Sequence, residues 1–276
     1  MMSDRNRMGI HTATVKPWSL QEACNAFAAK NVPAITLWRD AVEPVGLEAA
    51  RKMVDDAGLR VTSLCRGGFF PAADISGQQK AIDENKQIVD EAAALRAPAV
   101  VLVCGALPTL SLEESRKQIQ DGIAAVLPHA QAAGVKLSIE PLHPIYAADR
   151  SAVNTMAQAR RMCEQLNDTG KNDVGIALDV YHVWFDDALE SEIMQSGEKG
   201  WLHAFHICDW KAQQSDPLQD RGLMGEGVID IKRIRNWMDA ANYQGDIEVE
   251  VFSTRHWARD QHEYLEDILL AYDNCM

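Results

Sequence analysis

The sequence is poor in positive charge. Lys and Arg total 27 against 40 Asp and Glu, which gives a formal net charge of −13. Such a negative field repels phosphate backbones and anionic membrane surfaces, so we expect neither nucleic acid nor a membrane as a partner. The chain also lacks any run of roughly 20 apolar residues, the length of a membrane span, and its first residues carry no apolar stretch of signal-peptide length. We therefore expect a cytoplasmic protein.

Two kinds of motif are missing as well. The cysteines are scattered without a C-x-x-C pair, which argues against a zinc knuckle and a redox motif and favours reduced, mostly buried thiols. Neither G-x-G-x-x-G nor a Walker loop occurs, so we expect no nucleotide cofactor. The same absence weighs against a doubly wound open sheet, which normally carries a glycine-rich phosphate turn after its first strand.

The chain does contain short, β-branched apolar runs that alternate with amphipathic helical stretches, and this unit is repeated eight times. The alternation is typical of parallel βαβ units and predicts an α/β fold, the (β/α)8 TIM barrel. No linker or low-complexity tract divides the sequence, so residues 1–276 are expected to form a single domain. The expected strands are Ile10–Val15, Ala34–Trp38, Arg60–Leu64, Ala99–Val103, Lys136–Glu140, Gly175–Asp179, Leu202–Ile207 and Ile247–Phe252.

The helical stretches begin and end at recognisable cap residues. Two of them open on the capping box S-x-x-E, with SLQE at residues 19–22 and SLEE at residues 111–114. Gly58, Gly134 and Gly245 stand between a helical stretch and the next strand, where a helix end favours a residue that tolerates positive φ.

Polar residues stand at the C-terminal ends of four consecutive expected strands: Glu140, Asp179, His206 and Glu250. Alternate residues of a barrel strand point inward, and barrel active sites lie at these strand ends, so the four side chains should converge. Three inward carboxylates repel one another and lose solvation, so they require a cation. Oxygen ligands with one nitrogen suit Mn²⁺, Mg²⁺ or Co²⁺, and we expect one such divalent ion, with Mn²⁺ favoured. Glu248 is the competing fourth ligand, but it should lie one layer deeper.

Five segments carry a family resemblance: SIEPL at 138–142, LDVYH at 178–182, FHICD at 205–209, GEGVID at 225–230 and EVEVF at 248–252. On these motifs the sequence resembles the xylose isomerase-like TIM barrel superfamily of sugar phosphate isomerases and epimerases, over essentially its whole length. The resemblance implies that the same four residues are the metal ligands. It also places the D-x-x-H pair of ketose 3-epimerases on Asp179 and His182, which makes His182 a substrate contact.

One departure from the family pattern weighs against a plain ketose 3-epimerase. Those enzymes carry a further Glu six residues after the first metal ligand, where this chain has Tyr146. Endonuclease IV, another member of the superfamily, is a poorer match because it needs more histidines and a DNA-binding surface.

The expected function is a divalent-metal-dependent isomerase or epimerase that acts on a sugar or keto-sugar by proton transfer through a metal-stabilised enediolate. Glu140 and Glu250 would stand on opposite sides of the substrate, so that one abstracts a proton and the other returns it, while His182 orients or protonates a substrate oxygen. A metal-dependent lyase or dehydratase acting on a keto-sugar, inosose or related polyol stays open, as does a non-catalytic metal-binding subunit. The expected partner is a small carbohydrate, and a homo-oligomer is left open.

Other side chains are expected near the mouth of the barrel. His143 and Arg150 follow the fifth strand and could hold hydroxyls or an anionic group, and Arg66 follows the third strand. His11 is expected to line the interior and contribute to substrate binding. His203 has the opposite strand parity to His206 and should face the helices.

Residues 208–228 are too long for an ordinary connection between a strand and a helix. Irregular segments of this length are often functional. We expect this one to close over bound ligand as a lid, with Arg221 or Lys211 holding the ligand.

Overall fold

The computed structural model describes residues 5–167 and 170–276 and forms a closed barrel of eight parallel strands in the order of the sequence. The barrel closes where the first strand pairs with the last, with Ile10 aligned to Val249. The predicted (β/α)8 fold is therefore confirmed. The strands are β1 Met8–His11, β2 Ala34–Trp38, β3 Arg60–Gly68, β4 Ala99–Val103, β5 Lys136–Glu140, β6 Val174–Asp179, β7 Leu202–Ile207 and β8 Ile247–Val249.

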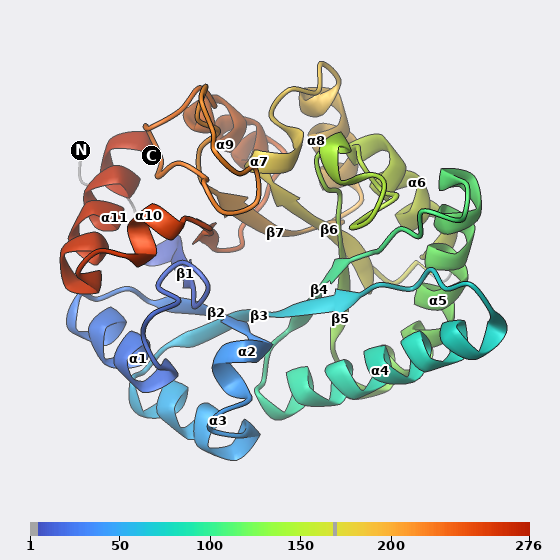
Figure 1. Ribbon diagram of the computed structural model, residues 1–276, viewed down its shortest axis with the longest axis horizontal. Coiled ribbons are helices and arrows are strands. Elements are labelled where there is room, and N and C mark those ends of the chain that lie inside the picture. The colour runs from blue at the N-terminus through green and yellow to red at the C-terminus, as the bar shows by residue number, and fades with distance from the viewer. Residues whose placement is uncertain (1–4, 168–169) are drawn as a thin grey trace.

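Helices form an outer ring around these strands (Figure 1), and Arg5, the first described residue, forms an ion pair with Asp273 of the last helix. Both predicted capping boxes are present, at Ser19 and Ser111. The helices are α1 Leu20–Ala29, α2 Arg39–Val42, α3 Leu47–Asp56, α4 Ile75–Ala94, α5 Leu112–Ala133, α6 Met156–Leu166, α7 Val180–Val183, α8 Leu189–Glu198, α9 Ile231–Ala240, α10 Thr254–Trp257 and α11 Gln261–Cys275, with 3-10 turns η1 Arg5–Arg7 and η2 Pro144–Tyr146.

Four strands differ from their predicted bounds, and the smallest difference is in β6, which begins one residue earlier than predicted, at Val174. β1 begins earlier and ends at His11, because the chain then turns and Thr14 Oγ1 bonds to the backbone around β8 instead of continuing a ladder. β3 runs on to Gly68, since a register shift after Cys65 lets it keep pairing with β4. β8 ends at Val249, three residues before the predicted end.

Two local predictions are wrong. β7 carries one extra residue opposite β6, because Ile176 aligns with Leu202 while Ala177 aligns with Ala204. The bulge turns His203 inward, where its Nδ1 lies 3.2 Å from Ser138 Oγ, so His203 does not face the helices. The left-handed residue after α9 is Asn242 with φ 62° and not Gly245, whereas Gly134 has the expected positive φ of 70°.

One layer of the barrel interior, below the C-terminal ends of the strands, is filled by small side chains. Cys65, Val101, Ala177 and Ala204 form a buried cluster of their own, packed against Trp38. The bulky residues of the same strands point outward into the main core between barrel and helices, which includes Leu64, Leu102 and Phe205. Small inward residues leave room above them for polar groups at the strand ends.

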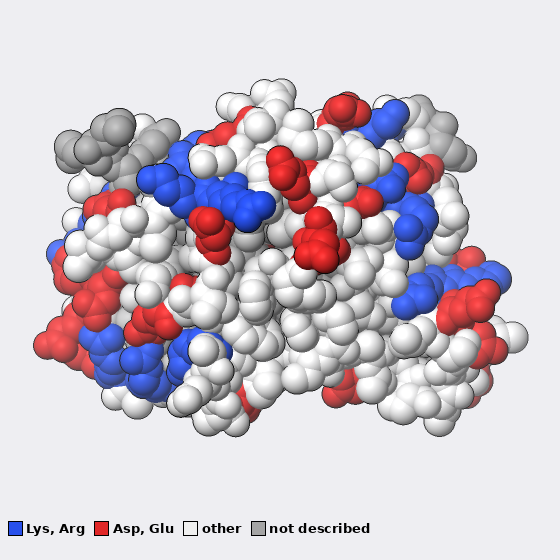
Figure 2. All heavy atoms as spheres, turned by 90° about the horizontal axis from the view of Figure 1, so that it is seen from above, with Lys and Arg blue, Asp and Glu red and all other residues white. Residues whose placement is uncertain are grey.

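All six cysteines are free thiols, and five of them are buried, as predicted. On the face drawn in Figure 2, basic and acidic side chains lie next to one another. Among the described residues, none of the helices combines the length and the apolar character needed to cross a membrane.

Candidate active site

The structure brings the four predicted ligands together at the C-terminal end of the barrel. Glu140, Asp179, His206 and Glu250 are all buried, and each offers a ligand atom that lies within 4.8 Å of the others. Glu140 and Asp179 are the last residues of β5 and β6, His206 is the last but one of β7, and Glu250 directly follows β8. Asp179 aligns with His206 in the β6–β7 ladder, whereas His206 aligns with Glu248 in the β7–β8 ladder.

The donor set fits a divalent cation. Glu140 Oε1 and both ring nitrogens of His206 are buried without a hydrogen-bond partner among the described residues. Glu140 Oε1 and His206 Nδ1 lie 3.3 Å apart. The two atoms lie within ion-pair distance of each other, and together they offer two donor atoms to one cation. Three carboxylates with one imidazole are donors for Mn²⁺, Mg²⁺ or Zn²⁺.

A buried guanidinium also enters this site. Arg221 Nη1 donates to Asp179 Oδ2 at 2.8 Å and to Glu250 Oε2 at 3.0 Å. Its Nη2 lies 3.3 Å from His182 Nε2, and its charge stands over the ring of Tyr181. Arg221 thus supplies a fixed positive charge to two of the three clustered carboxylates.

Burial and neighbouring charges shift the pKa values of these groups in different directions. Burial raises the pKa of Asp179 to about 7, although Arg221 acts against it. Burial would also raise the pKa of Glu250, but His11 and Arg221 outweigh it and hold that pKa well below its usual value. Burial, with Arg221, lowers the pKa of His182, so its imidazole is neutral at pH 7.

Glu248 lies one layer deeper, as expected for a residue two positions before Glu250. Its Oε2 accepts hydrogen bonds from the hydroxyls of Thr36 and Thr62, both at 2.6 Å. His11 stands between the layers, with Nδ1 2.9 Å from Glu250 Oε1 and Nε2 3.6 Å from Glu248 Oε2. His11 is fully buried and supports Glu250 from below.

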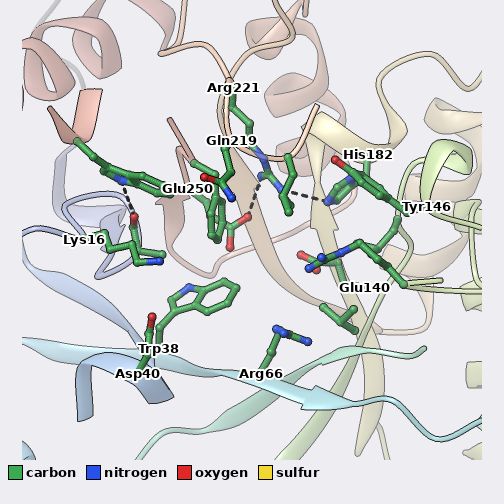
Figure 3. Close-up of a pocket in the computed structure, with 17 residues that line it drawn as sticks. Lys16, Trp38, Asp40, Arg66, Glu140, Tyr146, His182, Gln219, Arg221 and Glu250 are labelled. Carbon is green, nitrogen blue, oxygen red and sulfur yellow. Dashed lines mark hydrogen bonds and ion pairs between the residues drawn. The ribbon is translucent and has the colours of Figure 1, made fainter. Parts of the chain in front are cut away.

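The site opens into a cavity of about 210 Å³, whose walls include Glu140, His182, Arg221 and Glu250 (Figure 3). This volume is smaller than the roughly 300–1,000 Å³ of drug-sized ligand pockets, so it suits a small molecule.

Two of the other predicted contacts, Arg66 and Arg150, also line this cavity. His143 is not among the described residues that line it. Its ring stacks on Trp210 at 4.8 Å, and its Nδ1 accepts a hydrogen bond from the backbone of Ile145. The structure therefore gives His143 a packing role beside the site.

Sequence reasoning missed several residues of the cavity wall. Lys16, Asp40, Gln219 and Trp257 line it without having been singled out. Asp40 could have been found, because it lies two residues after the end of β2, where barrel sites are built. The others come from loops and a short helix whose path has no periodic signal.

The long segment 208–228 is folded against the barrel. The carboxylate of Asp209 accepts hydrogen bonds from the backbone of Trp210, Gly225, Gly227 and Ile229, each at 2.9–3.0 Å. Lys211 pairs with Asp220 and does not line the cavity, so only Arg221 of the two predicted cations reaches the site.

Comparisons with known proteins agree with this geometry. The family model described as xylose isomerase-like TIM barrel matches residues 19–268. An inosose isomerase from Halalkalibacterium halodurans is 27% identical over 209 residues, which cover 72% of this chain and 68% of that protein. An L-ribulose 3-epimerase from Mesorhizobium japonicum is 27% identical over 266 residues, or 90% and 82% of the two chains.

A solved structure is more similar. Protein SMc04130 from Sinorhizobium meliloti 1021 is 47% identical and superposes with a TM-score of 0.94, covering 99% of each chain. The fold and the arrangement of strands are therefore shared along the whole chain.

Proposed function

This chain belongs to the family of xylose isomerase-like TIM barrels, and we propose that it is a sugar isomerase or epimerase that moves a proton beside a carbonyl group with the help of a divalent metal ion. The observation that carries the proposal is the convergence of Glu140, Asp179, His206 and Glu250 beside a small cavity that the two glutamates line. The names of the two curated relatives, an inosose isomerase and an L-ribulose 3-epimerase, support the same class of reaction.

These four residues would hold the ion, for which we favour Mn²⁺. A bound divalent ion would polarise the substrate's carbonyl and hydroxyl oxygens and so stabilise negative charge on them. Its ligands are rigidly placed, because three of them belong to strands and Glu250 is held by His11 and Arg221.

Proton transfer falls to the two glutamates that line the cavity. Glu140 and Glu250 reach into it from β5 and from the end of β8 (Figure 3). One carboxylate removes a proton from the carbon beside the carbonyl, giving an enediolate, and the other returns a proton to it. The pKa of Glu250 is held well below its usual value, so this carboxylate is ionised at neutral pH.

The remaining polar groups orient the substrate. His182 is neutral and buried, and its Nδ1 has no hydrogen-bond partner among the described residues, so its ring has capacity for a substrate hydroxyl. The guanidinium of Arg221 presents a positive charge beside Glu250, where negative oxygen develops during the reaction.

The test is incubation of the Mn²⁺-loaded protein in D₂O with a panel of ketoses, keto-sugars, inososes and sugar acids, followed by NMR. We expect deuterium at a carbon beside the carbonyl, lost in Glu140→Gln and Glu250→Gln. Glu198→Gln, on the exposed end of α8, is the matched control and should exchange like the parent protein.

Three results would contradict the proposal in different ways. A product that has lost water relative to the substrate would identify a dehydratase, which uses the same first proton abstraction. Turnover without solvent deuterium would indicate a direct hydride shift. Undiminished metal binding by calorimetry in Glu140→Gln, Asp179→Asn, His206→Ala and Glu250→Gln would remove the metal site itself.

A further inference from the structure

Two arginines of the cavity wall form no ion pair with an acidic side chain among the described residues. Arg66 and Arg150 both line the cavity and are half-buried. Neither guanidinium forms a hydrogen bond or an ion pair within 4.0 Å with any residue that the structure describes, whereas Arg221 in the same cavity contacts two carboxylates. The positive charge of this pair is therefore available to a ligand.

The acidic neighbours do not neutralise the pair. Both arginines line the same cavity, and burial together with the charge of Arg150 lowers the pKa of Arg66. Glu140 acts on Arg66 only from a distance and belongs to the proposed metal group. Asp40 is exposed at the rim of the cavity, where water screens its charge.

Aromatic rings fix the two side chains without using their hydrogen-bond donors. The guanidinium carbon of Arg66 lies 4.5 Å from the centre of the Phe69 ring, and that of Arg150 lies 5.8 Å from the centre of the Tyr146 ring. A guanidinium placed against a ring keeps its N–H edges free. Figure 3 shows Arg66 and Arg221 entering the cavity from opposite sides. An anion bound by Arg66 would thus lie away from the cluster formed around Arg221.

We propose that the substrate carries an anionic group, a carboxylate or a phosphate, which Arg66 and Arg150 bind at the end of the molecule remote from the reacting carbons. The inference rests on the proposed function for the identity of the substrate as a small sugar. Guanidinium groups bind both anions in a bidentate manner, so the structure points to their shared chemistry. The two arginines would select a sugar acid or a sugar phosphate over the neutral sugar.

Calorimetry of the Mn²⁺-loaded protein with three matched probes tests this. D-fructose, D-fructuronate and D-fructose 6-phosphate differ only at the sixth carbon, as hydroxymethyl, carboxylate and phosphate ester. At least one anionic probe should bind about ten- to hundredfold more tightly than D-fructose, the range for two or more charge-assisted hydrogen bonds. The tighter of the two charged probes identifies the source of the anion, and added salt should weaken only their binding.

Variants assign the preference to the pair. Arg66→Gln and Arg150→Gln should each reduce binding of the anionic probe about tenfold and reduce D-fructose binding by a much smaller factor, and Arg150→Lys should keep part of the anion binding. Arg161→Gln, on the exposed face of α6, controls for the loss of one positive charge. Circular dichroism confirms that each variant is folded.

Equal or absent binding of all three probes would overturn the inference, as would an anion preference that survives in both glutamine variants. Calorimetry reads binding and not turnover, so the two proposals fail separately. An intact anion preference without any proton exchange refutes only the proposed function. Proton exchange on neutral sugars without an anion preference refutes only the role of Arg66 and Arg150.

Discussion

Replacing Arg221 by methionine tests whether its guanidinium and a metal ion neutralise the same carboxylates. Methionine keeps much of the side-chain volume and removes the charge. Arg221 is buried and donates to Asp179 and Glu250, so the substitution leaves two carboxylates facing each other in a water-poor site. We expect a large loss of stability when no metal is present.

The magnitude follows from burial and chain length. Removing one partner of a buried ion pair costs about 3–5 kcal/mol. A chain of 276 residues unfolds with an entropy of about 0.6 kcal/mol per degree near its midpoint, so the Tm should fall by about 5–8 °C. A divalent ion neutralises the same carboxylates and should reduce this loss to less than half. By thermodynamic reciprocity, the variant should then bind Mn²⁺ at least about tenfold more tightly than the parent protein.

The assay is thermal unfolding in EDTA and in saturating Mn²⁺, with metal affinity measured by calorimetry. Arg161→Met, on the exposed face of α6, is the control and should shift Tm by less than about 1 °C. A Tm in EDTA that stays within about 1 °C of the parent would refute the claim that Arg221 stabilises the carboxylates. An equal loss with and without Mn²⁺ would refute the claim that the two cations substitute for each other.

Three further predictions concern the surroundings of the site. Burial raises the pKa of Glu226, but hydrogen bonds from His256 and Arg255 outweigh it and hold that pKa at about 2, below the usual 4.5. The stability that ionised Glu226 gives to the folded protein is therefore present above pH 4.5 and is lost as the pH falls toward 2. After allowance for solvent screening, Glu226→Gln should lower the free energy of unfolding by about 1 kcal/mol, or the Tm by about 2 °C, at pH 7. The difference in Tm between the variant and the parent protein should vanish near pH 2, and a difference that stays constant down to that pH would contradict this. Gly122→Ala would place a methyl group 2.4 Å from the ring of Phe70, so the free energy of unfolding, measured in urea, should fall by about 1–3 kcal/mol. An unchanged urea midpoint would show that the Phe70 ring moves aside without cost. Asp209→Asn removes a charged acceptor of four backbone hydrogen bonds, so amide hydrogen exchange at 225–229 should become faster while that of β4 stays unchanged. Protection of 225–229 equal to that in the parent protein would refute this anchoring role.

Strand parity predicted the inward polar groups well where the ladder is regular. β4 and β5 pair residue by residue, from Ala99 with Lys136 to Val103 with Glu140, so counting in twos along β5 correctly places Glu140 at its inner end. The same counting failed for His203, because one extra residue in β7 reverses the parity on its N-terminal side. A bulge depends on how two strands fit together and leaves no periodic mark in either sequence.

The contacts of loop residues could be predicted only in part. Arg221 was expected near a ligand, but its insertion between Asp179 and Glu250 depends on the path of residues 208–228. That path is set by hydrogen bonds to the single carboxylate of Asp209, which no sequence period encodes. Likewise, His143 packs against Trp210 because two distant loops meet there.

Closure of the barrel has a consequence for how the chain folds during synthesis. The contacts that join β1 to the end of the barrel are remote in sequence, as with the hydrogen bond between Thr14 and the carbonyl of Val249, 235 positions away. Until β8 emerges from the ribosome, β1 and β7 both present unpaired backbone edges, which are templates for association with other chains. Such long-range pairing slows folding, so these edges stay open to association with other chains until the last strand is made.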